Sequence, residues 1–148
     1  MNTIDTKNVI ADWITSHENE LIEAANYIFA HPELAYQETL SSQYLANYLK
    51  ENGFEITYNT AGIDTAFTAV WRSNGSPSAK RPFIGFLAEY DALAEIGHAC
   101  GHNLLGTGVC AAACALKADM EQTGAPGTIY VYGCPAEEIM SGKIIMNQ

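Results

Sequence analysis

The sequence is poor in basic residues: seven lysines and arginines stand against 17 aspartates and glutamates, a formal net charge of −10 over 148 residues. Such a surface repels phosphate backbones and anionic headgroups, so neither nucleic acid nor a membrane surface is expected as a partner. No stretch approaches the ~20 consecutive apolar residues that span a bilayer. The first 20 residues lack the basic start and apolar run of a secretory signal peptide, which predicts a cytoplasmic location.

Cysteine is also sparse, and no pair among the four forms a CxxC motif. Disulfides are not expected in a chain without secretion signals. Cys110 and Cys114 lie one helical turn apart in an alanine-rich segment and are predicted to be small buried core residues. A thiol-redox role for Cys100 or Cys134 is one alternative function, although the missing CxxC argues against it.

What is present suits a globular fold, because 48% of the residues are hydrophobic and 148 residues normally make one domain with a core. Helical spacing and short apolar runs bounded by turn residues alternate along the chain. This mixture predicts an α/β layered domain. The predicted helices cover Ile4 to Ala30 in two pieces around Ser16 and His17, Thr39 to Asn52, and Asn103 to Gln122; the predicted strands cover Phe54 to Asn59, Ala66 to Arg72, Pro82 to Tyr90, and Thr128 to Gly133.

Two details of this pattern carry further expectations. The run PFIGFLAEY over 82–90 is almost continuously apolar, which favours a strand buried on both faces. A polar stretch, SNGSPSAK over 73–80, predicts a turn before it. The last residues, GKIIMNQ, contain apolar side chains that predict the start of another element.

Polar residues gather in two clusters, each directly after a predicted buried strand. In open α/β sheets ligands bind beyond the carboxyl ends of the strands, so both clusters are expected at one edge of the sheet. A thiolate and an imidazole two residues apart suit zinc or a related ion, although CxH also occurs in ordinary loops. Paired glutamates can divide metal ligation and proton transfer, or can simply form a solvated acidic turn. The first cluster comprises Glu89, Asp91, His98, Cys100, His102 and Asn103, and the second Glu137 and Glu138.

Taken together, four segments resemble the aminoacylase and carboxypeptidase type of dinuclear metallohydrolase, and especially the amidohydrolases of the aminobenzoyl-glutamate utilisation B kind. They are HPELAYQE at 31–38, FLAEYDAL at 86–93, GHACGHNLLGT at 97–107 and GCPAEE at 133–138, in the family's order. The resemblance implies a helix-sheet-helix catalytic domain of the zinc-dependent exopeptidase type. Residues 1–148 would be its N-terminal part, without the dimerisation domain and the C-terminal part of the catalytic domain.

The resemblance also implies a reaction, and a role for every residue of the two clusters except Glu89. Two divalent ions, zinc or manganese, would support hydrolysis of an amide in N-acyl amino acids or dipeptide-like substrates such as aminobenzoyl-glutamate. Cys100, His102 and Glu138 match metal ligands, Glu137 matches the general base, and Asp91, His98 and Asn103 match residues that support the site from behind the ligands; His31 of the HPE motif is expected to be structural.

The chain departs from the family pattern in several places. Asn103 and Leu105 stand where many relatives have aspartate and a further histidine, Ala94 replaces a proline, and 139–142 replaces a glycine run. The family takes two more histidine ligands from downstream sequence, and this chain has no histidine after His102. The chain is therefore expected to be inactive alone, whereas the complete enzyme is expected to be a homodimer. The alternative is a non-catalytic truncated product, or one segment of a split enzyme that needs a complementing chain.

Overall fold

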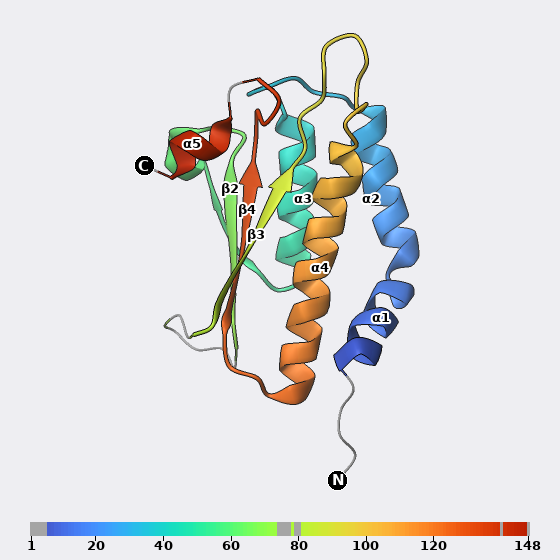
Figure 1. Cartoon of the computed structure of the whole chain (residues 1–148), viewed down its shortest axis with the longest axis vertical. Coiled ribbons are helices and arrows are strands. Elements are labelled where there is room, and N and C mark those ends of the chain that lie inside the picture. The colour runs from blue at the N-terminus through green and yellow to red at the C-terminus, as the bar shows by residue number, and fades with distance from the viewer. Residues whose placement is uncertain (1–5, 74–77, 79–80, 140, 148) are drawn as a thin grey trace.

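A computed structural model describes residues 6–73, 78, 81–139 and 141–147. The chain forms a four-stranded mixed sheet with its longer helices on one side and a short C-terminal helix on the other, as Figure 1 shows. The α/β layered class predicted from the sequence is confirmed. None of the described helices is long and apolar enough to cross a membrane.

The helices begin and end where the sequence signals stand. The predicted start of the first helix, Ile4, lies outside the described residues, but the helix is indeed divided at His17. Its second piece ends before His31-Pro32, since the residue preceding a proline disfavours helical angles. The longest helix ends at Gly124, whose left-handed φ of 71° suits glycine. The helices are α1 Thr6–Ser16, α2 Glu18–Ala30, α3 Thr39–Glu51, α4 His102–Thr123 and α5 Gly142–Met146, with a 3-10 turn η1 at Thr60–Gly62.

The four strands are β1 Glu55–Tyr58, β2 Phe67–Arg72, β3 Phe83–Glu89 and β4 Thr128–Cys134. Their order in the sheet is β1-β2-β4-β3. Neighbouring strands are antiparallel except for β3 and β4, which are parallel and joined through α4 as parallel strands require. In their register Glu89 lies opposite Cys134, so both strands finish at the same edge.

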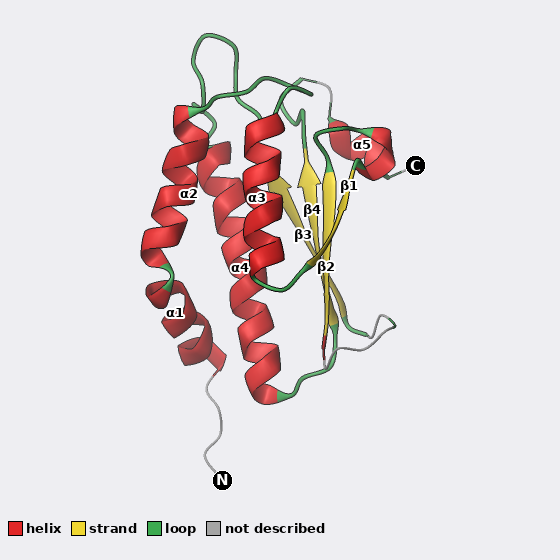
Figure 2. Cartoon of the chain, turned by 180° about the vertical axis from the view of Figure 1, so that it is seen from behind, coloured by secondary structure: helices red, strands yellow, loops and turns green. Residues whose placement is uncertain are grey.

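The core lies between the sheet and the helices α2, α3 and α4. Ile28, Leu49, Phe67 and Ile129 are fully buried there. Cys110 and Cys114 on α4 are free thiols inside this core, as predicted. Figure 2 shows the helical layer from behind, with the sheet on one side of it only.

The expectation that the third strand is buried on both faces is wrong for the described chain. Phe83 and Leu87 of β3 are each 51% exposed. Leu87 lies on the face of the sheet that carries α5, opposite the layer formed by α2, α3 and α4, and α5 is the one described α-helix on that face (Figures 1 and 2). α5 is the element predicted from the apolar C-terminal residues, whereas the predicted turn over 73–80 lies largely outside the described residues.

Candidate metal centre

The parallel pair β3 and β4 brings the two polar clusters together. The loop that follows Glu89 and the loop that follows Cys134 leave the same edge of the sheet. Carboxylates from both segments lie within 4.0 Å of the imidazole of His102, which is the first residue of α4. The prediction that both clusters meet at one edge is therefore confirmed. The group formed by His102, Glu89, Glu137 and Glu138 is called the acidic cluster below.

His102 is oriented by Asp91. Its Nδ1 lies 3.0 Å from the Asp91 carbonyl oxygen and 3.1 Å from Asp91 Oδ1. The carbonyl oxygen can only accept, so Nδ1 carries the proton and donates it to that oxygen, while Oδ1 lies nearby without a hydrogen bond of its own. Nε2 then faces oxygens of Glu89 at 3.5 Å, Glu138 at 3.7 Å and Glu137 at 4.0 Å. Metal-binding histidines are usually held in this way, with the far nitrogen bound to a carbonyl or carboxylate.

The donor atoms are spaced for a divalent ion. One ligand atom from each of Glu89, His102 and Glu137 lies within 4.8 Å of the others. Bonds of about 2.0–2.2 Å to nitrogen and oxygen place the ligands of one zinc ion roughly 3.4 Å apart in a tetrahedron. The observed spacing, up to 4.8 Å, is wider than this, so the two glutamate side chains would move closer when one ion binds. An imidazole among carboxylates is therefore a candidate site for a divalent ion.

Cys100 lies on the exposed side of the cluster. Its thiol donates a hydrogen bond to the Glu138 carboxylate, and this bond, with a smaller contribution from burial, raises the pKa of Cys100. A cation at the cluster would reverse this effect, because a coordinating thiol is deprotonated. The structure thus places Cys100 beside Glu138, its predicted fellow ligand, while the tighter group of three contains Glu89 and Glu137 instead.

Asp91 also connects the two loops. Its side chain is buried, with 2% of the residue exposed, and Oδ2 accepts a hydrogen bond of 3.0 Å from the Glu138 backbone nitrogen. One carboxylate therefore touches both the His102 ring and the backbone of the second loop. Loss of Asp91 would release both at once.

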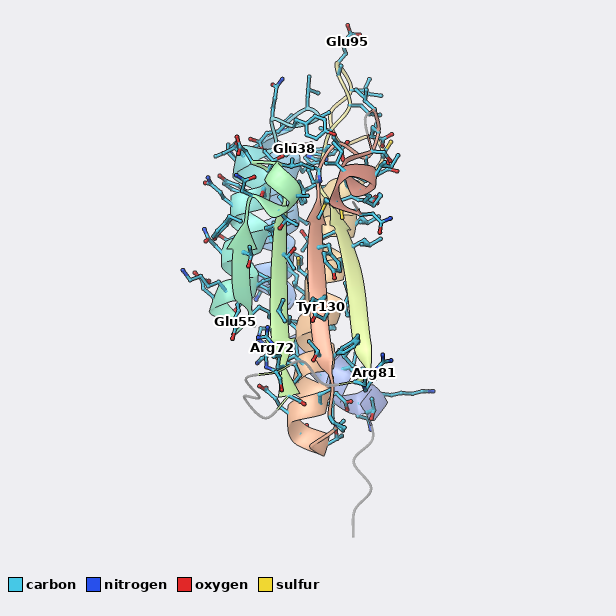
Figure 3. The ribbon with its side chains drawn as sticks, turned by 90° about the vertical axis from the view of Figure 1, so that its left-hand side faces the viewer. Glu38, Glu55, Arg72, Arg81, Glu95 and Tyr130 are labelled. Atoms are coloured by element: carbon cyan, nitrogen blue, oxygen red, sulfur yellow. The ribbon has the colours of Figure 1, made fainter. Side chains whose placement is uncertain are left out.

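The buried carboxylate of Glu38 also fixes the loop that carries Glu137. Glu38 has no exposed surface, and its Oε1 accepts a 2.8 Å hydrogen bond from the Ala136 backbone nitrogen. Ala136 has a left-handed φ of 57°, which alanine adopts only at a cost in free energy, and it directly precedes Glu137. Figure 3 shows Glu38 at the end of the sheet where β4 finishes. Burial raises the pKa of Glu38.

The remaining predicted residues lie further from the cluster. His98 is buried, and loss of solvent is the largest cause that lowers the pKa of its imidazole. Asn103 turns toward the helical layer, where its Nδ2 donates a 3.2 Å hydrogen bond to the Ala25 carbonyl of α2. His31 bonds through Nδ1 with the Tyr27 carbonyl at 2.7 Å, at the end of α2.

Glu89 of the acidic cluster, and Lys143 beside it, received no role from the sequence. Glu89 is the last residue of β3, and a charge at the end of an apolar strand was the available signal. Lys143 gave no signal, because it meets the cluster only when α5 folds back toward the sheet. Its Nζ contacts Glu89 Oε1 and lies 3.8 Å from Glu137 Oε1.

Comparison with known proteins gives this geometry a context. No family model matches the chain. The chain is 40% identical to one of the subunits of the p-aminobenzoyl-glutamate hydrolase of Escherichia coli over 154 aligned residues, which cover 93% of this chain and 31% of that protein. This chain is a homologue of that hydrolase. It is also 36% identical to the mouse Xaa-Arg dipeptidase, over 93% of this chain and 33% of that enzyme.

Solved structures agree with the homology. A protein of methicillin-resistant Staphylococcus aureus assigned as an aminohydrolase superposes with a TM-score of 0.77 and 27% identity, over 95% of this chain and 38% of that one. A dinuclear metal-binding peptidase of the M20 family from Bacillus subtilis superposes with a TM-score of 0.64 and 24% identity, over 84% of this chain and 36% of that one. The chain thus has the fold of part of an M20-family peptidase, and spans about a third of the length of the curated relatives it matches.

Proposed function

We propose that this chain carries the general base and part of the ligand set of a metal-dependent amidohydrolase. The observation that carries the proposal is the orientation of His102. Asp91 fixes its Nδ1, and Nε2 faces three carboxylates in a cluster whose spacing fits a divalent ion. The homology to two hydrolases supports the same reaction class.

The residues divide the chemistry as follows. His102 and Glu138, with Cys100 beside them, would hold zinc or manganese. An ion there would supply Lewis acidity, which acidifies water and polarises the amide carbonyl. Glu137, 35% exposed at its side chain, faces the cluster and would take the proton from water. The same carboxyl then protonates the leaving amine. His98 and Asn103 would hold the loop and the start of α4 without touching the substrate.

The substrate class follows from the relatives' names, both of which describe cleavage next to an amino acid. We propose N-acyl amino acids and dipeptide-like amides as substrates, with aminobenzoyl-glutamate as the first candidate. The proposal includes a cytoplasmic location and small molecules, rather than nucleic acid or membranes, as binding partners.

Two ions need more ligands than the described cluster provides. We therefore propose that these 148 residues are the N-terminal part of a catalytic domain, that they do not turn over substrate alone, and that further histidines come from sequence or a chain beyond them. The complete enzyme would be a homodimer. A segment of a split enzyme, completed by a partner chain, is the second candidate, which is favoured because the Escherichia coli relative is itself named as one subunit of its hydrolase. A truncated, non-catalytic product would share the same cluster.

The test replaces the matching third of the Escherichia coli relative with this chain and assays release of aminobenzoate. Hydrolysis that stops in the Glu137→Gln variant, while metal content by elemental analysis is unchanged, is the expected result. Retained hydrolysis in that variant would remove Glu137 from the role of base. A chimera that binds metal but cleaves none of the amides offered would overturn the proposed reaction.

A further inference from the structure

The acidic cluster concentrates like charges at one edge of the sheet. Glu89, Glu137 and Glu138 converge on one imidazole nitrogen, and Asp91 lies directly behind it. Carboxylates this close repel one another unless a cation lies among them. In the metal-free chain, a positive side chain next to these carboxylates would offset part of this repulsion.

Lys143 is that group. Among the described residues, the ion pairs that join a lysine or arginine to this cluster all come from Lys143, with Glu89 and Glu137. The backbone just before Lys143 packs closely on another segment, since a Cβ added at Gly142 would lie only 2.3 Å from the Pro135 carbonyl oxygen. The first turn of α5 thus packs directly against the base of the loop that carries Glu137.

The two carboxylate oxygens of Glu137 face different partners. Oε2 lies 4.0 Å from His102 Nε2, whereas Oε1 lies 3.8 Å from the Lys143 ammonium. Glu89 is divided in the same way, with Oε2 toward His102 and Oε1 in contact with Lys143. The ammonium thus binds the outer oxygens of two side chains whose inner oxygens face the metal position.

We propose that Lys143 is an internal competitor for the metal, and that Glu89 becomes an additional metal ligand once a divalent ion displaces the ammonium. This inference rests on the proposed metal centre and adds to it a residue that sets its affinity. The side chain of Lys143 is 28% exposed and has a flexible four-carbon stem, so it can move into solvent without unfolding α5. In the metal-free chain, the ion pairs of Lys143 would offset the repulsion between carboxylates and so favour the folded state. They would also raise the metal concentration needed to fill the site.

The test is calorimetric titration of the 148-residue chain with Zn²⁺, and separately with Mn²⁺. Lys143→Gln is expected to bind the ion about tenfold more tightly, because the ion no longer has to displace an ammonium from Glu89 and Glu137. Lys117→Gln is the matched control. Lys117 is 20% exposed and also paired, with Glu121 on α4, so this variant makes the same change in net charge at a distant ion pair. Lys143→Arg keeps the charge and should not bind more tightly.

A double variant tests the role of Glu89. In Lys143→Gln with Glu89→Gln, the gain in affinity should disappear, because the freed ligand is gone. Glu89→Gln alone should bind metal more weakly than the native chain. Unchanged or weaker binding in Lys143→Gln, with normal binding by the native chain, would overturn the inference and leave the proposed function standing. Absence of binding in every variant would overturn the inference for this chain, whereas the proposed function is tested separately by the chimera.

Discussion

Glu38 and Glu55 make nearly equal contacts in two different regions of the molecule. Glu38 accepts a hydrogen bond of 2.8 Å from the Ala136 nitrogen at the loop edge of the sheet, and Glu55 accepts one of 2.7 Å from Arg72 on the neighbouring strand β2. Yet Glu38 has no exposed surface, whereas the Glu55 side chain is 78% exposed (Figure 3). Because the two distances are nearly equal, burial is expected to decide how much each contact contributes to the stability of the fold.

The two regions also differ in what their contacts connect. Arg72 and Glu55 join neighbouring antiparallel strands that the β1–β2 ladder already holds together. At the loop edge, by contrast, Glu38 and Asp91 fix segments that no ladder connects. Substitutions at the loop edge should therefore cost more than equivalent ones near β1.

Glu38→Ala should give the largest loss of stability. It leaves the Ala136 N–H without its partner in the interior and opens a cavity, for a cost of about 3 kcal/mol. Urea unfolding followed by circular dichroism measures it. A loss as small as that of an exposed glutamate would contradict the role of burial.

The pH dependence of the stability of Glu38→Gln tests the same role of burial. Because burial raises the pKa of Glu38, the folded native chain gains from the protonated carboxyl at acidic pH and loses that gain as pH rises through the raised pKa. Glutamine has no such ionisation. The destabilisation by Glu38→Gln should therefore be largest in acid and shrink toward neutral pH, in unfolding curves measured across that range. A difference that grows with pH would show a carboxylate stabilised in its charged form.

Gly106→Ala should have the next largest effect. A Cβ at Gly106 would lie 2.6 Å from the Glu89 carbonyl oxygen, a backbone atom that cannot turn aside, so we expect a loss of about 1–3 kcal/mol. Gly108 lies on the same helix with nothing within 4 Å of its added Cβ. Gly108→Ala should instead stabilise the chain by about 0.5–1 kcal/mol. Equal melting temperatures for the two variants would show that α4 does not pack closely on the end of β3.

Asp91→Ala tests the support behind the cluster. It frees the His102 ring and the Glu138 backbone together, and residues in such positions are typically worth about 10- to 100-fold in metal affinity. Titration with Zn²⁺ measures this loss, with Asp119→Ala on the distant part of α4 as a control for a buried aspartate. Equal affinities in the two variants would remove Asp91 from the support of His102.

Glu55→Gln should have the smallest effect. The exposed pair with Arg72 is screened by solvent, so a change below about 1 kcal/mol is expected. A loss comparable to that of Glu38→Ala would erase the contrast between the two regions.

The sequence was sufficient for the elements and for the meeting of the two clusters. The helix spacing, the break at His17 and the glycine after α4 are local signals, and they predicted bounds within one or two residues of those observed. The clusters meet because parallel strands end at the same edge, which is a general property of the fold class. The roles of the cluster residues remain predictions.

What the sequence could not show depends on tertiary packing. The exposure of Phe83 and Leu87 depends on which face of the sheet the helices cover, and an apolar run does not reveal what covers each face. The fold of α5 over the sheet decides where Lys143 lies. The buried position of Glu38 depends on a contact with Ala136, 98 residues away in the sequence. No local pattern encodes such a contact.

That contact has a consequence for the time course of folding. A bond between residues 38 and 136 closes most of the chain into one loop, and the entropy of such long-range closure is lost before the contact returns any stability. Ala136 should therefore acquire its protected amide late, after α3 and the β1–β2 ladder have formed. In pulsed hydrogen exchange during refolding, the time at which the Ala136 amide becomes protected would report when the segment around Glu38 and the loop after β4 come into contact.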